Sequence, residues 1–190
     1  ASRYSNAFCA AVRLLPVSFS GSLRDLDAVR ERVSVPVLRK DFMVEDYQIF
    51  EARAHGADVV LLIVAALCDA QLDDMYSLAR SLGMRVLVET HTPEELERAL
   101  ASDAELIGVN ARNLKTLDVD LHYACALLES VPSDRLAVGE SAVATIRDVE
   151  AYARAGADAV LVGEALVRHA DPTKAARDFC SVERQRRAGR

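Results

Sequence analysis

Five polar residues stand at the ends of apolar runs, where the chemistry of parallel α/β proteins is usually found. They are Lys40, Glu89, Asn110, Arg112 and Glu140. Strands that are buried on both faces read as near-continuous apolar runs, and active sites lie at the carboxyl ends of such strands. A lysine facing two glutamates would pair their charges and perturb their pKa values, as general acids and bases require. One charged residue at a strand end is more often a solvated loop residue, but five together favour a site.

Two segments of small residues predict an anion-binding site. Gly139-Glu140-Ser141-Ala142 follows one apolar run and Gly163-Glu164-Ala165 follows the next. Backbone N–H groups of small residues beside a helix N-terminus bind phosphate. The predicted phosphate-binding residues are Ser141, Ala142, Gly163 and Glu164. The alternative for Gly163 is that it serves only a tight turn.

The elements that must position these residues repeat along the chain. Predicted strands start near residues 35, 58, 85, 106, 136 and 159, so that 21 to 30 residues separate successive starts and leave room for one helix each. Helix N-termini are predicted where Ser or Thr precedes an acidic residue by three positions, at Ser22, Thr92 and Thr145. The triplet Gly-Ala-Asp occurs at 56–58 and 156–158; in each, Gly ends a helix and Asp leads into a strand. We expect Asp41 to be a local turn partner.

A succession of βα units is compatible with an open doubly wound sheet or with a (β/α)8 barrel. The Gly-x-Gly-x-x-Gly pattern of the first class is absent from the sequence, and the regular period favours the TIM-barrel type. We therefore predict an α/β fold of the (β/α)8 type, incomplete at the N-terminus, with six clear βα units and a seventh doubtful. Residues 11–17 could add a strand that Arg13 interrupts and Pro16 closes. The predicted divisions are an unassigned segment 1–17, a partial barrel domain 18–183 and a basic, disordered tail 184–190.

Composition narrows the classes of function. Of 190 residues, 51% are hydrophobic, and the net charge of -6 argues against a nucleic-acid surface. Four cysteines are widely spaced, which predicts neither a metal site nor a disulfide framework and suits a cytoplasmic protein. We expect no membrane span and no signal peptide, because the chain has no apolar run of about 20 residues and no leader pattern.

Several motifs together resemble the indole-3-glycerol phosphate synthase family over about residues 18–176. They are 37–42 (VLRKDF), 47–53 (YQIFEAR), 87–89 (LVE), 108–114 (GVNARNL) and 156–164 (GADAVLVGE). The resemblance implies a (β/α)8 carbon–carbon lyase of tryptophan biosynthesis, a carboxy-lyase without cofactor or metal. It would convert 1-(2-carboxyphenylamino)-1-deoxyribulose 5-phosphate to indole-3-glycerol phosphate, with loss of carbon dioxide and water.

The same resemblance assigns roles to the predicted residues. Lys40 corresponds to the family's general acid and Glu89 to its acid/base carboxylate. Three further residues correspond to those that hold the substrate: Asn110, Arg112 and Glu140. Ser141, Ala142, Gly163 and Glu164 fall in the phosphate loops, and Ala142 stands where the family has Gly, which penalises any positive φ there.

The resemblance also sets expectations about what differs. The family's first-strand Glu-x-Lys and Ser-Pro-Ser do not occur here, and residues 1–17 do not match, so we expect an N-terminally truncated chain with unpaired strand edges that favour self-association. Two alternatives stay open. One is another phosphate-binding barrel enzyme acting on a different sugar phosphate; the other is a catalytically impaired fragment that acts only as an interaction partner.

Overall fold

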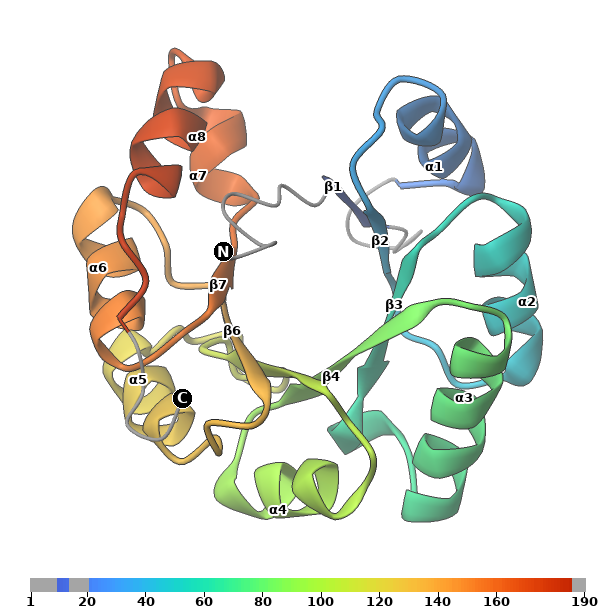
Figure 1. Cartoon of the computed structure of the whole chain (residues 1–190). Helices are drawn as coiled ribbons and strands as arrows, with labels where there is room; N and C mark the ends of the chain where they lie inside the picture. Colours follow the sequence, from blue (N-terminus) through green and yellow to red (C-terminus); the bar gives the residue numbers. More distant parts are fainter. Residues whose placement is uncertain (1–9, 14–20, 186–190) are drawn as a thin grey trace. The chain divides into compact units, whose positions relative to one another are not determined.

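The computed structural model describes residues 10–13 and 21–185, and within these residues strands and helices alternate (Figure 1). The strands are β1 (Ala10–Arg13), β2 (Val37–Lys40), β3 (Val59–Ile63), β4 (Arg85–Thr90), β5 (Leu106–Asn110), β6 (Leu136–Glu140) and β7 (Ala159–Leu161). The α-helices are α1 (Leu23–Arg30), α2 (Asp46–Ala54), α3 (Asp69–Ser81), α4 (Pro93–Ala101), α5 (Leu121–Glu129), α6 (Ile146–Arg154), α7 (Glu164–Arg168) and α8 (Pro172–Cys180), with a 3-10 turn η1 (Val64–Ala66).

The order of the strands separates the two predicted fold classes. The strands follow one another in the sheet in chain order, from β1 to β7. A doubly wound sheet reverses its strand order at a switch point, whereas successive βα units of a (β/α)8 fold keep it. The predicted TIM-barrel class is therefore confirmed, and the doubly wound alternative is excluded.

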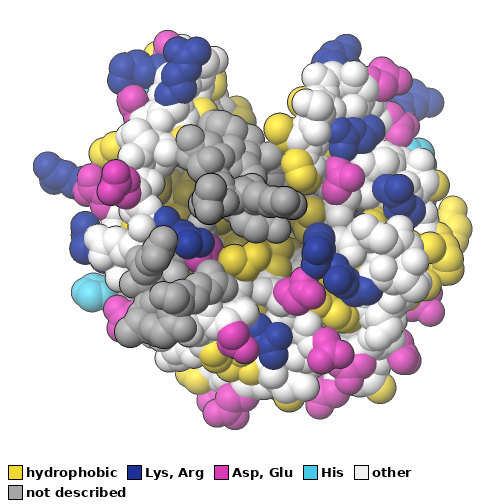
Figure 2. Space-filling view, in the orientation of Figure 1, with side chains coloured by type: hydrophobic (Ala, Val, Ile, Leu, Met, Phe, Trp, Pro, Cys, Tyr) yellow, Lys and Arg dark blue, Asp and Glu magenta, His cyan; other side chains and the backbone are white. Residues whose placement is uncertain are grey.

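The chain divides into two compact units, and the division falls within β4. The first unit comprises Ala1–Val88 and Ser102–Ala104, and the second comprises Glu89–Ala101 and Glu105–Arg190. On the face drawn in Figure 2, basic and acidic side chains are interspersed over the surface, which is consistent with a modest net charge of -6.

In the first unit, three parallel strands carry helices on one face. β1 pairs with β2 from Ala10 opposite Val37 to Arg13 opposite Lys40, and β2 pairs with β3. Figure 1 shows α1, α2 and α3 beside these strands. The core between helices and strands is mainly apolar, with Leu26, Ile49, Val60, Leu62 and Leu72 at 1% exposure or less. Burial of such side chains is the main favourable term that holds the unit together.

In the second unit, β5, β6 and β7 form a parallel array. Leu106 lies opposite Leu136, and the register continues to Asn110 opposite Glu140; Glu140 in turn lies opposite Leu161 of β7. α5 and α6 lie beside these strands, and α8 lies beside α7 (Figure 1). Because parallel strands end at the same edge, this register brings the residues that follow β5, β6 and β7 to one rim of the unit.

The predicted helix starts are confirmed where the caps can be seen. The carboxylate of Asp25 accepts hydrogen bonds from the Ser22 backbone N–H at 2.7 Å and from its hydroxyl at 2.8 Å. Asp148 does the same for the Thr145 N–H at 2.7 Å. Each cap satisfies donors that the first helical turn leaves without a partner.

The repeated Gly-Ala-Asp triplets build the same junction in both units. Gly56 and Gly156 have φ of 80° and 91°, which ends the preceding helix. The carboxylate of Asp58 accepts from the Val37 N–H at 2.8 Å, and that of Asp158 accepts from the Ala137 N–H at 2.9 Å. Each Asp therefore does more than lead into its own strand. Its carboxylate also binds the backbone at the start of the neighbouring strand.

The ends of the chain differ in part from what the sequence indicates. A strand is present at 10–13, within the segment that we leave unassigned, and Arg13 is its last described residue. Residues 14–20, which include the predicted closing residue Pro16, lie outside the described residues. Arg184, the first residue of the predicted tail, donates to Asp158 at 2.8 Å, and residues 186–190 are not described.

Candidate active site

A buried polar cluster joins the ends of β4, β5 and β6 in the second unit. The Asn110 side-chain amide donates to Glu89 Oε1 at 3.0 Å, and the Ser141 hydroxyl donates to Asn110 Oδ1 at 2.8 Å. The exposed fraction of Glu89 is 1% and that of Asn110 is 8%. A buried carboxylate is costly unless it is hydrogen-bonded, so this chain of contacts is what lets Glu89 stay inside. Three of the predicted site residues are thereby brought together.

His91 belongs to the same cluster, although the sequence analysis does not select it. Its ring Nε2 lies 3.3 Å from Glu89 Oε1, and its Nδ1 lies 3.2 Å from Glu95 Oε2. Burial lowers the pKa of His91, but hydrogen bonds and charges of Glu89 and Glu95 outweigh burial and raise the pKa to about 9. The signal in the sequence is the spacing. His91 follows Glu89 by two positions, and residues that are two positions apart in an extended segment point to the same side.

Glu140 is fixed at the end of β6 by its main chain. Its carbonyl oxygen accepts from the Ala111 N–H at 2.9 Å and from the Tyr152 hydroxyl at 3.0 Å. The exposed fraction of Glu140 is 1%. Burial of the phenol, together with nearby negative charges, raises the pKa of Tyr152, so the hydroxyl remains a hydrogen-bond donor. Tyr152 from α6 thus determines where β6 ends.

The backbone just after β6 adopts the left-handed conformation twice. Ser141 has φ of 63° and Ala142 has φ of 57°. Only Gly adopts this region without steric cost. The strain expected at Ala142 is therefore present, and the loop that was predicted to bind phosphate is held in an uncommon conformation.

The other predicted phosphate segment lies at the end of the neighbouring strand. Gly163 caps the five-residue helix α7, and a Cβ added at Gly163 would meet nothing within 4 Å. The Glu164 side chain is 61% exposed and pairs with Arg168 at 3.1 Å. The space beside Gly163 is thus open, and a backbone N–H there could be approached by an anion.

Arg112 lies at the rim of the second unit. Its backbone N–H donates to Asn110 Oδ1 at 3.0 Å, while its guanidinium donates to the Leu117 carbonyl at 3.3 Å and lies 3.8 Å from Glu164. The side chain is 39% exposed. Its backbone supports the Asn110 side chain, and its charge stays accessible to an anionic ligand.

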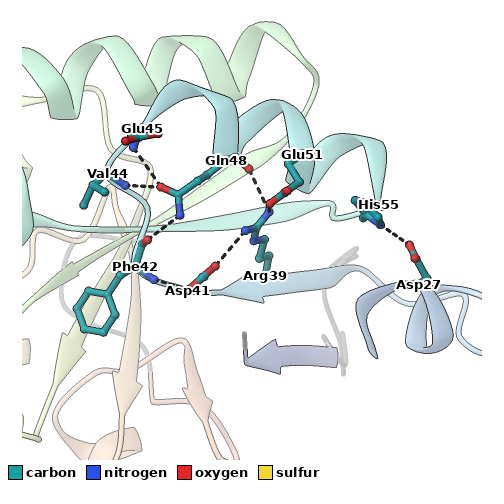
Figure 3. A network of polar contacts seen from close by, with 9 residues as sticks. All are labelled: Asp27, Arg39, Asp41, Phe42, Val44, Glu45, Gln48, Glu51 and His55. Carbon is teal, nitrogen blue, oxygen red and sulfur yellow. Dashed lines mark hydrogen bonds and ion pairs between the residues drawn. The ribbon is translucent and has the colours of Figure 1, made fainter. Parts of the chain in front are cut away.

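Lys40 lies in the first unit, at the last position of β2, and is half-buried. Its neighbour Arg39 turns toward α2, where it pairs with Glu51 at 2.8 Å and with Asp41 at 3.0 Å (Figure 3). Since adjacent strand residues point to opposite faces, Lys40 points away from α2. The two cations at this strand end thus divide their roles: Arg39 braces the strand against its helix, and Lys40 faces the other side.

Asp41 is the local turn partner that the sequence predicts. One oxygen accepts from the Phe42 N–H at 2.9 Å and the other pairs with Arg39. Gln48, on α2, donates to the Phe42 carbonyl and accepts from the N–H groups of Val44 and Glu45 (Figure 3). These bonds fix the loop that follows Lys40.

Among residues 10–13 and 21–185, no group of three or more His, Cys, Asp or Glu side chains is arranged to hold a metal ion. Over the same ranges, none of the helices has the length and apolar character needed to cross a membrane.

Comparison with known proteins gives the family. A model described as indole-3-glycerol phosphate synthase matches residues 1–179. The chain is 58% identical over 178 residues to the indole-3-glycerol phosphate synthase of Micrococcus luteus, covering 93% of this chain and 66% of that protein. It is also 58% identical over 164 residues to the same-named protein of Arthrobacter sp., covering 86% and 60%. The chain thus spans less than two thirds of the length of these two relatives.

A solved structure supports the fold. The 3-hexulose-6-phosphate synthase from Salmonella typhimurium superposes with a TM-score of 0.74 at 17% sequence identity, covering 90% of this chain and 84% of that one. At this identity the likeness concerns the fold alone.

The extent of the match corrects one expectation. Residues 1–17 were expected to fall outside the resemblance, yet the family model begins at residue 1. Arg13 is the last described residue of β1 and lies opposite Lys40, and a polar residue at the carboxyl end of a strand is usual in this fold. With a matched family model over nearly its whole length, the chain belongs to the indole-3-glycerol phosphate synthase family.

Proposed function

We propose that this chain is a carbon–carbon lyase, an indole-3-glycerol phosphate synthase acting on 1-(2-carboxyphenylamino)-1-deoxyribulose 5-phosphate. The observation that carries the proposal is the buried Glu89–Asn110–Ser141 cluster in a chain that is 58% identical to proteins of that name. A carboxylate kept inside by an amide and a hydroxyl is suited to move protons near a ligand.

The proposed reaction forms one carbon–carbon bond and releases carbon dioxide and water. The aromatic carbon that bears the carboxylate attacks the ketone carbon of the sugar chain, and the ketone oxygen takes a proton. Loss of carbon dioxide restores the aromatic ring, and loss of the hydroxyl with a proton from the adjacent carbon completes the indole. No redox step occurs, so the reaction needs proton donors and acceptors but no metal or cofactor.

Lys40 is proposed as the general acid that protonates the ketone oxygen. Lys40 is half-buried at the end of its strand, and a lysine ammonium group carries protons that it can donate to an oxygen developing negative charge. Glu89 is proposed as the carboxylate that accepts and returns a proton in the later steps.

The remaining predicted residues are proposed to hold the substrate. Asn110 and Glu140 would contact its polar groups, and the half-exposed guanidinium of Arg112 would pair with the substrate carboxylate. The phosphate would lie against the backbone N–H groups of Ser141, Ala142, Gly163 and Glu164. We further propose a small sugar-phosphate substrate, no nucleic-acid or membrane partner and a cytoplasmic location.

The test is a fluorescence assay of indole-3-glycerol phosphate formation with the purified chain. We expect Lys40→Ala and Glu89→Gln each to lower kcat by at least about 100-fold, because general acid–base groups contribute about 10² to 10⁴ in rate. Arg32→Ala is the control, since Arg32 is exposed just after α1 and its guanidinium donates to the Ala28 backbone carbonyl at 2.8 Å. Turnover that is unaffected by Lys40→Ala would refute the assignment of the general acid.

A further inference from the structure

His91 lies between two carboxylates that come from different elements. Glu89 is the next-to-last residue of β4, and Glu95 lies in the first turn of α4. The ring nitrogens of His91 approach them at 3.3 Å and 3.2 Å, and the side chain is 11% exposed. A histidine that contacts one carboxylate through each nitrogen is held in both position and tilt.

Glu95 anchors the histidine on the side away from Glu89. Its Oε2 accepts from the His91 backbone N–H at 2.7 Å as well as facing the ring Nδ1. Its own backbone N–H donates to the Thr92 hydroxyl at 3.2 Å. Glu95 is thereby part of the helix start that the sequence predicts, so the cap of α4 also fixes the His91 ring.

On the side of His91 that faces Glu89, the side chains of His91 and Asn110 approach the same carboxylate oxygen. His91 Nε2 lies 3.3 Å from Glu89 Oε1, and Asn110 Nδ2 lies 3.0 Å from the same atom. A hydrogen bond from β5 and an ion pair with the residue after β4 therefore act on the same carboxylate oxygen. Since Glu89 is 1% exposed, water cannot replace either partner without a rearrangement.

The charges around His91 favour its protonated form. The groups facing it are the carboxylates of Glu89 and Glu95, with Arg98 acting on Glu95 from the same helix. Burial alone would lower the pKa of His91, but these carboxylates raise it to about 9. Near neutral pH the ring is therefore an imidazolium that lies between two carboxylates, 3.3 Å from Glu89 and 3.2 Å from Glu95.

We propose that His91 is a positioning residue, an imidazolium anchored by Glu95 that keeps the Glu89 carboxylate ionised and in one orientation for proton transfer. The inference rests on the proposed function, because it gives Glu89 its state at the start of the reaction. The proposal adds two residues to the site, His91 and Glu95. Neither of them touches the reacting atoms.

The experiment compares His91→Gln and Glu95→Gln with Glu94→Gln in the full chain. Glu94→Gln is the matched control. It removes the same charge from the same turn of α4, and Glu94 does not face His91. Gln at position 95 can still accept from the His91 N–H, so the helix cap is kept while the charge is lost. In His91→Gln we expect kcat to fall at least about 10-fold with KM changed less than about 3-fold, because outer positioning partners typically contribute about 10- to 100-fold.

Two readouts separate positioning from a general loss of structure. The acidic limb of the kcat/KM profile should move up by about one pH unit or more in His91→Gln, because the buried carboxylate loses its cationic neighbour. NMR titration of the His91 ring should show its high pKa in the wild-type chain and in Glu94→Gln, and a fall of about one unit or more in Glu95→Gln. This titration does not depend on turnover.

The outcomes distinguish the two proposals. If the wild-type chain forms no indole-3-glycerol phosphate, the proposed function fails, and if Glu89→Gln is as active as the wild type, the roles of Glu89 and of His91 fail together. If Glu89→Gln is inactive while His91→Gln keeps its kcat and its pH profile, only the positioning role is overturned. It is also overturned if the His91 ring titrates near 6.5, or if Glu95→Gln leaves its titration unchanged.

Discussion

At Gly139 the structure predicts a large effect of a single added methyl group. A Cβ there would lie 2.5, 2.6 and 2.7 Å from three ring carbons of Tyr152, a side chain that is fully buried. Carbon atoms normally approach no closer than about 3.5 Å, so the ring must move by about 1 Å in Gly139→Ala. That movement also disturbs the bonds from the Tyr152 hydroxyl to the carbonyls of Glu140 at 3.0 Å and Ser141 at 3.3 Å.

The magnitude follows from these contacts. Overpacking of a close-packed core costs about 1–3 kcal/mol, and each disturbed hydrogen bond adds about 1 kcal/mol. We expect Gly139→Ala to lower the free energy of unfolding by about 2–4 kcal/mol, a large part of the about 5–15 kcal/mol that stabilises a typical domain. Because the sequence contains no Trp, urea unfolding is best followed by far-UV circular dichroism.

The controls test the cause. Gly163→Ala places its Cβ where nothing lies within 4 Å, so we expect a change of about 1 kcal/mol or less. In the background Tyr152→Leu, which removes the ring, Gly139→Ala should cost at least about 1 kcal/mol less than in the wild type, since contacting residues couple in a double-mutant cycle. An equal cost in both backgrounds, or a cost below about 0.5 kcal/mol in the wild type, would refute the reasoning.

Three further predictions concern other parts of the molecule. Ala142→Gly should raise the free energy of unfolding by about 1 kcal/mol because it relieves the positive φ of 57°; a lower urea midpoint would contradict this. Arg39→Ala should destabilise by about 3 kcal/mol, because it leaves the carboxylates of Asp41 and Glu51 without their buried partner, whereas Arg32→Ala should change stability by less than about 0.5 kcal/mol. The raised pKa of His91 contributes stability that is fully present below pH 6.5 and is lost as pH rises through about 9; unfolding at successive pH values should show a loss on the order of 3 kcal/mol over this window, and His91→Gln should abolish it.

The junctions between elements show how far local sequence rules extend. The Gly-Ala-Asp triplets were interpreted as helix end and strand entry, and both parts are present at both positions. The bond from each Asp carboxylate to the strand before it could not be predicted, since its partners Val37 and Ala137 are 21 residues away in the chain. Dihedral preferences act within a few residues, whereas this bond depends on strand register.

The same distinction separates the parts of the site. The apolar runs located the strands, with β5 and β6 starting at the predicted residues, and the polar residue at each strand end selected Glu89, Asn110 and Glu140. All three residues are less than 9% exposed, so they are not the solvated loop residues of the alternative interpretation. Their roles in catalysis stay proposals.

What the sequence by itself determined was the parallel α/β class, the helix starts, the family and the strand ends that carry polar residues. These features depend on period and on spacing within one element, which a linear pattern records directly. Tertiary structure alone decided that His91 lies between Glu89 and Glu95, that Tyr152 packs on Gly139, and that Arg39 rather than Lys40 braces β2. Each of these depends on which side chain fills the space between elements, and because that space is set by packing, the order of residues along the chain does not specify it.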